Sequence, residues 1–255
     1  MLKKILRYTL RISGGLIALF LLGLVIIWSY VIFNKPSILR KVTTELNKKV
    51  RGQILIADID PSFFHTFPYI SVRFSKVIIH DSLWQQHRHN LLEAEKIFAR
   101  LNIFSIFSGQ PTVNKILIEE GSLYLFSDST GYTNANIFHP QKTPIRNSKT
   151  VLPDIGLKNI HLVIVKDYRK KFFDFNIRRL NCDIKTQETF LLLDINMAVL
   201  VSTMAFNTDN GSFLEEKQVA GKIRLQFNPA SKVLQFNNIV LQLNNHPFTL
   251  PGNFS

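Results

Sequence analysis

From residue 53 onward, apolar side chains recur at every second position, and this alternation constrains the fold more than any other feature of the chain. A strand places successive side chains on opposite faces, so the spacing predicts strands with one apolar face. The clearest run lies within 190–203 and consists of Leu191, Leu193, Ile195, Met197, Val199 and Val201. Similar segments are 53–60, 70–75, 97–103, 113–119, 123–126, 155–166, 171–184, 217–227 and 233–243.

About ten strands with scarcely any helix between them predict a mainly β protein with an antiparallel, meander-like sheet. Glu120-Gly121-Ser122 is expected to join two short strands, and Asp128–Gly131 supplies turn-forming residues that close this hairpin. The apolar face must be covered. A second sheet would make a sandwich, whereas a curved, taco-like sheet would leave an apolar trough. Alternation alone does not separate these two architectures.

The segment Ile12–Phe33 is 22 residues long and carries no charge. At 1.5 Å per residue it is long enough to cross about 30 Å of hydrocarbon. A cleaved signal peptide is the competing interpretation, but the run is too long and Ser29–Asn34 has no small-x-small cleavage site. We expect an uncleaved single-pass transmembrane anchor over 12–33, with a basic cytoplasmic tail over 1–11 and the bulk of the chain across the membrane.

The residues after this segment predict a short amphipathic helix over Pro36–Val50, in which proline suits the first turn. Its apolar stripe consists of Ile38, Val42, Leu46 and Val50. A basic helix beside a membrane can lie on headgroups. The alternative, which we favour, is that it covers the first strands.

The segment His139–Leu152 contains two prolines and little apolar material, so it is the best candidate for a linker. It would separate an N-terminal β domain over 34–138 from a second β segment over 153–255. We expect the second segment to continue the same sheet and to be incomplete at its C-terminal end.

The formal net charge of +13 and the isoelectric point near 9.9 suggest an anionic neighbour. Nucleic acid is not expected, because Lys and Arg are interleaved singly with strand residues rather than gathered beside aromatic platforms or a reading helix. Lipid headgroups, or simply a solvated face, fit this distribution better.

No arrangement of residues predicts catalysis, a metal or a cofactor, so we do not expect an enzyme. His87 and His89, with His80 and Asp81 nearby, match no standard metal spacing. The single cysteine, Cys182, has no partner for a disulfide and is interpreted as a small buried apolar residue.

The order of the segments is similar to that of the N-terminal region of the AsmA family, which is related to TamB and to chorein-type bridge-like lipid transfer proteins. The resemblance covers nearly the whole chain. The motifs that carry it are Gly52–Ile56, Ile70–Ser82, Leu91–Asn134 (with Asp128, Gly131 and Asn134 in a D-x-x-G-x-x-N pattern), Ile155–Asp167 and Val219–Phe227.

This resemblance implies a periplasmic β-groove anchored in the inner membrane, which serves phospholipid transport to the outer membrane and the assembly of that membrane. Family members are generally longer. Ten strands at about 4.8 Å each make a trough of only about 45 Å. We therefore expect a fragment, a truncated member, or a short member that acts with envelope protein partners.

Three functions follow as hypotheses. The first is a groove that binds phospholipid or another acyl lipid, beside the inner membrane. The second is a membrane-tethered structural or adaptor protein of envelope biogenesis without lipid transfer, and the third is a metal-dependent enzyme that uses His87 and His89. The expected groove residues are Leu191, Leu193, Ile195, Met197, Ile223, Leu225, Ile239 and Leu241.

Overall fold

The computed structural model describes residues 33–62, 70–102, 105, 112–137, 152–187, 189–236 and 239–250, with isolated positions nearer the N-terminus. Nearly all of the expected linker 139–152 lies outside the described residues, and so does about half of the expected anchor 12–33. Within the part that is described, no helix combines the length and the apolar content needed to cross a membrane.

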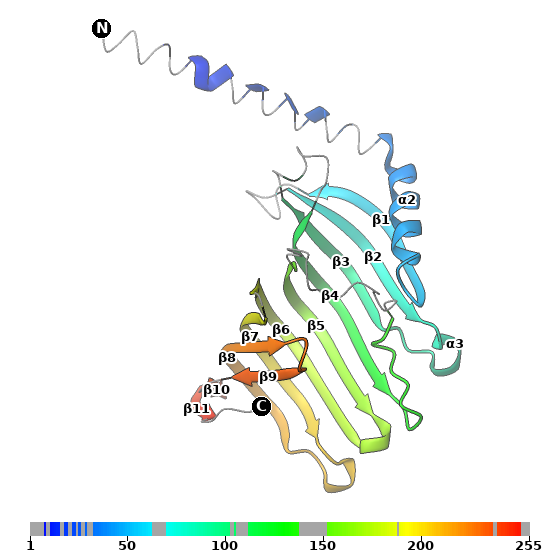
Figure 1. The fold of residues 1–255 in the computed structure, drawn as a ribbon, viewed down its shortest axis with the longest axis vertical. Helices are drawn as coiled ribbons and strands as arrows, with labels where there is room; N and C mark the ends of the chain where they lie inside the picture. Colours follow the sequence, from blue (N-terminus) through cyan, green and yellow to red (C-terminus); the bar gives the residue numbers. More distant parts are fainter. Residues whose placement is uncertain are drawn as a thin grey trace.

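The described strands form one 11-stranded sheet, which confirms the prediction of a mainly β protein (Figure 1). Along the sheet the order is β1-β2-β3-β4-β5-β6-β7-β8-β10-β11, and β9 pairs with β8. The strands are β1 (Gly52–Ser62), β2 (Ser71–Asp81), β3 (Leu92–Leu101), β4 (Val113–Ser127), β5 (Asp154–Lys166), β6 (Lys171–Thr186), β7 (Leu191–Ala205), β8 (Leu214–Asn228), β9 (Val233–Phe236), β10 (Ile239–Leu243) and β11 (His246–Leu250). The short helices between them are α3 (Trp84–His87), η2 (Asp167–Arg169) and η3 (Thr208–Asn210). The two-sheet sandwich is therefore not found among these strands.

The predicted hairpin at Glu120–Ser122 is wrong, because β4 runs straight through it. Pairing with β3 continues on both sides, with Glu119 opposite Lys96 and Gly121 opposite Ala94. A Cβ atom at Gly121 would lie 2.0 Å from the carbonyl oxygen of Glu93. Glycine stands here because two backbones approach closely, rather than because the chain turns.

The prediction of an antiparallel sheet is wrong at one place, since β4 and β5 pair in parallel from Lys115–Asp154 to Ser127–Lys166. The residues after β4 explain how the chain reverses there. Asp128 Oδ1 accepts hydrogen bonds from the amides of Thr130 (2.8 Å) and Tyr132 (3.0 Å), which closes a turn of the Asx type. The chain then leads back, so that β5 begins at the same end of the sheet as β4.

Asn134 holds the reversed chain against the edge of β4 that β3 no longer covers. Its side chain is buried, donates to the carbonyl oxygen of Tyr124 at 2.7 Å and accepts from the amide of Phe126 at 2.8 Å. One amide side chain thus takes the place of a neighbouring strand and satisfies two backbone groups. This accounts for the Asn of the D-x-x-G-x-x-N pattern.

A row of residues with positive φ crosses the sheet, at Lys76 (φ 49) on β2, Glu120 (φ 58) on β4 and Asn159 (φ 53) on β5. The pairs on either side of this row show that its members lie side by side. The pairing of β6 with β7 shifts register at the same level, between Ile177 and Arg179. Each interruption bends its strand and moves the alternation by one residue.

The helix α2 (Lys35–Asn47) lies against β1 rather than extending to Val50 as predicted. Leu46 packs on the core cluster formed by Val50, Ile54, Val77, Leu91 and Ile137. Asn47 accepts from the amide of Ile54 (2.7 Å) and donates to its carbonyl oxygen (2.9 Å), so it covers part of the edge of β1. Of the two placements considered for this helix, the structure has the one over the first strands.

Candidate functional site

The eight residues predicted to form a groove lie on one face of the last strands. Leu193 is opposite Leu225, and Ile195 is opposite Ile223. Gly221 lies between Met197 on β7 and Leu241 on β10. Leu191 pairs with Phe227. Ile239 precedes Val240, which pairs with Lys222, and this spacing places it beside Ile223. We call this side of the whole sheet the inner face.

The inner face continues across the earlier strands, which the sequence analysis did not include in the groove. Successive cross-strand pairs connect Met197 to Leu180, Leu180 to Leu157, and Leu157 to Ile118. Two further pairs extend the row to β2, from Ile118 to Ile97 and from Ile97 to Phe74. These strands alternate in the same way, but the row of positive-φ residues shifts their alternation, so the apolar positions on its two sides are out of phase in the sequence.

On β8 the opposite face is polar. Its inner residues Ile223 and Leu225 are half-buried, whereas the intervening Lys222, Arg224 and Gln226 are exposed. Arg224 Nε donates to Asp194 Oδ1 on β7 at 2.6 Å. The hydrogen bond to this carboxylate raises the pKa of the Arg224 guanidinium. Along β8 the two faces therefore differ sharply, with apolar side chains on the inner face and polar ones on the other.

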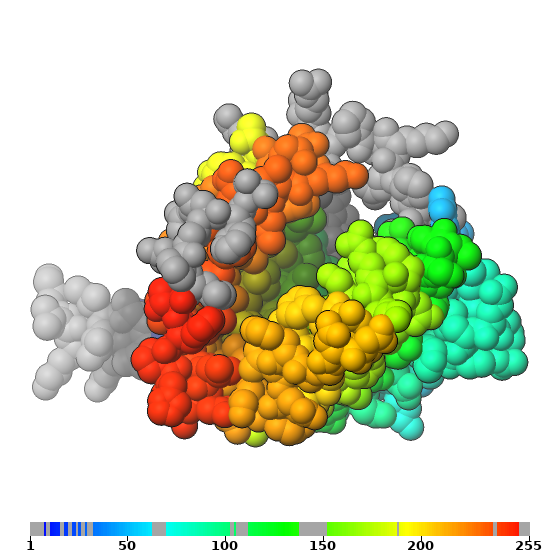
Figure 2. Space-filling view, turned by 90° about the horizontal axis from the view of Figure 1, so that it is seen from below, coloured from blue at the N-terminus to red at the C-terminus, as the bar shows by residue number. Residues whose placement is uncertain are grey.

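The inner face surrounds a hollow, seen in Figure 2 between the orange residues near β9 and the yellow to gold residues of β7 and β8. The side chains of β7 that face it are half-buried. The other end of the same face is filled, because Leu46 of α2 and Ile137 pack over Ile54 and Val77. The inner face is thus a packed core beneath α2 and partly uncovered along β7 and β8.

Cys182 lies on the inner face, between Ile155 on β5 and Ile195 on β7. It was predicted to be buried and is half-buried. Burial raises the pKa of its thiol, and the neighbouring carboxylate of Asp183 raises it further. A thiol in this environment is a poor nucleophile at neutral pH, which fits the interpretation of Cys182 as an apolar side chain.

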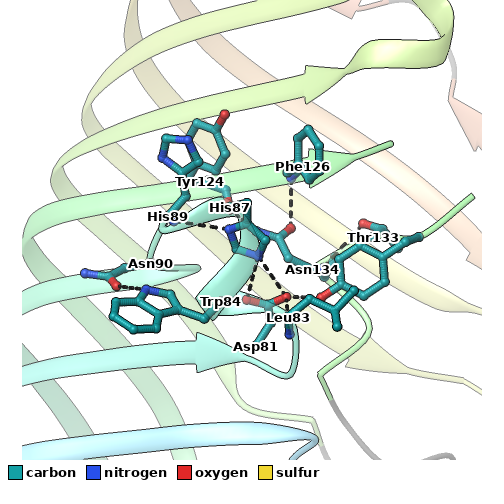
Figure 3. A network of polar contacts seen from close by, with 12 residues as sticks. Asp81, Leu83, Trp84, His87, His89, Asn90, Tyr124, Phe126, Thr133 and Asn134 are labelled. Carbon is teal, nitrogen blue, oxygen red and sulfur yellow. Dashed lines mark hydrogen bonds and ion pairs between the residues drawn. The ribbon is translucent and has the colours of Figure 1, made fainter. Parts of the chain in front are cut away.

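The histidines considered for a metal belong to a polar network at the end of β2 (Figure 3). His87 Nε2 lies 3.0 Å from Asp81 Oδ1, and the Asp81 side chain is almost fully buried. Asp81 Oδ2 also accepts from the amide of Leu83 at 3.3 Å and from the hydroxyl of Tyr132. The network connects β2 to the segment that reverses the chain after β4.

The hydrogen bonds of His87 occupy both of its ring nitrogens. Nδ1 accepts from the amide of His89 at 3.1 Å, so Nε2 carries the proton that faces Asp81. His89 instead stacks on Tyr124, with ring centroids 4.1 Å apart. Across the residues that the structure describes, no group of three or more His, Cys, Asp or Glu side chains is arranged to hold a metal ion. The arrangement suits a structural role for His87.

Comparison with known proteins does not assign a family. No protein-family model matches the chain, and no curated protein matches it significantly.

Proposed function

We propose that the inner face is a lipid-binding trough, in which acyl chains lie against the apolar side chains of β5 to β10. The observation that carries this proposal is the unbroken row of apolar cross-strand pairs from Phe74 on β2 to Met197 on β7, on a face whose side chains are half-buried along β7 and β8 around the hollow. On this face the polar groups of a water-soluble ligand would have no hydrogen-bond partners, whereas a hydrocarbon chain needs no such partners.

The proposed setting is the one that the AsmA-like order of segments implies. Residues 12–33 would anchor the chain in the inner membrane, with the N-terminus in the cytoplasm and the sheet in the periplasm. The trough would take phospholipid or another acyl lipid from that membrane and would serve transport to, and assembly of, the outer membrane. Envelope proteins would be its partners, since the ten strands along the path of the sheet, at about 4.8 Å each, make a trough of only about 45 Å.

The test is native mass spectrometry of the full chain after extraction into neutral nanodiscs and release in the gas phase. We expect co-purified phospholipid on the wild type. Leu193→Glu places a charge on the inner face and should remove that lipid, because burying a carboxylate beside Leu225 is unfavourable.

The matched control is Leu192→Glu. Leu192 immediately precedes Leu193 on β7, but it pairs with the exposed Gln226 and belongs to the opposite face. Lipid should remain on this variant. Absence of lipid from the wild type, or equal lipid on both variants, would count against the trough.

A tethered adaptor without lipid transfer is the second candidate. The packing of Leu46 and Ile137 over Ile54 favours it, because this end of the inner face is already filled by the protein itself. A hydrophobic dye separates the two functions. An adaptor with a covered face should bind little dye, whereas an open trough should bind dye and release it to added phospholipid.

A further inference from the structure

Three turns of the chain lie at one end of the strands, toward the lower right in Figure 1. They are α3 between β2 and β3, η2 between β5 and β6, and the β7–β8 turn that contains η3. The pairing registers place all three at the same end of the strands. We call the side chains Trp84, Tyr168, Phe206 and Phe213 on these turns the aromatic rim.

Three members of the aromatic rim are exposed to an unusual degree, whereas Trp84 is half-buried. Phe213 is 75% exposed, Tyr168 50% and Phe206 48%. Phe206 contacts both Phe213 (ring centroids 6.0 Å apart) and Phe173 (5.4 Å), and Phe173 stacks on Phe175 at 6.2 Å. Because Phe173 and Phe175 face Met204 and Val201 across β6 and β7, the rings form a continuous apolar path from the inner face to the outside.

Cations accompany these rings. Arg88 lies over Trp84 at 5.2 Å, Arg169 over Tyr168 at 5.2 Å, and Lys171 over Phe206 at 5.6 Å. Lys170 forms an ion pair with Asp209, so these two side chains add no net charge. Asp167 is on the same turn as Arg169, and Glu215 and Glu216 follow on β8, so the excess of positive charge is modest. Aromatic rings beside Lys and Arg are the composition that proteins place at the level of lipid headgroups.

The turns that present these side chains are held together. The amide of Thr208 donates to the carbonyl oxygen of Lys170 at 2.7 Å, which joins the β7–β8 turn to the β5–β6 turn. The side chain of Asn207 accepts from the amide of Asp209 at 3.1 Å and caps η3. Phe206 and Phe213 are therefore displayed on a fixed frame and lose little freedom when they become buried.

We propose that the aromatic rim docks onto the surface of a lipid bilayer containing anionic lipid, and that this bilayer is not the one that would hold residues 12–33. Lys35, where α2 begins, is bonded to Asp58 and Asp60, toward the other end of the strands. Strands such as the 16-residue β6 span roughly 50 Å, so the rim lies far from that point. Phe213 and Phe206 enter the interface, and Arg169 and Lys171 contact phosphate groups.

The test is capture of vesicles by the full chain. The protein is reconstituted into phosphatidylcholine nanodiscs and immobilised on a surface through an N-terminal tag. Vesicles of phosphatidylcholine with one third phosphatidylglycerol are then passed over it. We expect the wild type to capture them and Phe213→Ser to capture about tenfold less, as expected for losing most of one buried Phe side chain. Val240→Ser, at another exposed apolar residue (56%), is the control and should capture as the wild type does.

Fluorescence gives a second, independent readout. In a Trp84→Phe background, Phe213→Trp should be quenched by vesicles with brominated acyl chains, because its ring would lie among them. Absence of quenching, or equal capture by Phe213→Ser and the wild type, would overturn the proposal. The lipid-binding trough is tested separately: Leu193→Glu should lose bound lipid and still capture vesicles, whereas Phe213→Ser should keep its lipid.

Discussion

Glu120 on β4 and Asn159 on β5 occupy equivalent positions of two parallel strands, and both have positive φ, 58 and 53. Neither strand ends there, since pairing resumes at Gly121 and Ile160. Their side chains are exposed on the polar face, whereas Ile160 is buried on the inner face. The bend of the sheet therefore passes through residues whose backbone conformation is unfavourable for most L-amino acids.

The bend predicts opposite effects of two substitutions at Asn159. Asn159→Gly should be neutral or stabilising, because glycine adopts this conformation without strain. Asn159→Val should lower the free energy of unfolding by roughly 1–2 kcal/mol, because a β-branched residue is strained at positive φ. Urea denaturation of the full chain in detergent measures both. Gln226→Val, at an exposed position of β8, is the control and should change stability by less than about 0.5 kcal/mol; equal effects at both sites would contradict the strained bend.

The side chain of Asn134 should matter for stability far more than that of its neighbour Asn136. Asn134→Ala leaves the amide of Phe126 and the carbonyl of Tyr124 without their hydrogen bonds in a buried setting. We expect a loss of about 2–3 kcal/mol in the free energy of unfolding. Asn136→Ala, at an exposed residue, should be nearly neutral. Hydrogen exchange at Phe126 gives a local check, since it should accelerate only in the first variant.

The ion cluster that holds the start of α2 predicts a loss of stability in acid. Burial favours the neutral form of Asp60, but hydrogen bonds from Lys35 and Arg73 outweigh it and lower the pKa of this carboxyl. A depressed pKa stabilises the fold above the pKa of an unfolded aspartate, about 3.9, and this contribution is lost as the pH falls through the folded value. Asp60→Asn should therefore cost about 1 kcal/mol at pH 7, after allowance for solvent screening, and progressively less as the pH falls through the folded pKa.

The same cluster should respond in alkali through Lys35. Hydrogen bonds to Asp58 and then to Asp60 raise the pKa of its ammonium group. That contribution is complete below the unfolded pKa and disappears as the pH rises above the folded value. Chemical denaturation from pH 2 to pH 11 measures both limbs. Glu45→Gln, which affects only an exposed pair with Lys48 on α2, should leave the loss of stability in alkali unchanged.

Cys182 offers a probe of the inner face. Since burial and Asp183 raise the pKa of its thiol, alkylation by a soluble maleimide at pH 7 should be slow. A cysteine at exposed Lys222 on the polar face, in a Cys182→Ser background, should react at least about tenfold faster. Added phospholipid should slow Cys182 further and leave the Lys222→Cys thiol unaffected. If lipid protects neither thiol, the inner face near Cys182 is not a lipid site.

Alternation along 191–201 determined that β7 is a strand and which of its side chains share a face, because both depend only on neighbours in the chain. Leu193 and Ile195 were placed on one face without knowledge of any partner strand. The same reasoning placed a hairpin at Gly121, because a glycine that permits close approach of two strands cannot be distinguished in sequence from one that permits a turn.

Only the tertiary structure decided that β4 and β5 are parallel and that the sheet bends at Glu120 and Asn159. The parallel pairing depends on contacts between distant parts of the chain, such as that of Tyr132 with Asp81, 51 residues apart. The bend requires several strands to adopt an unfavourable conformation at one level, which neighbouring strands enforce together. The local preferences of the sequence encode neither these long-range contacts nor the bend. The curvature that shapes the inner face is therefore a property of the assembled sheet.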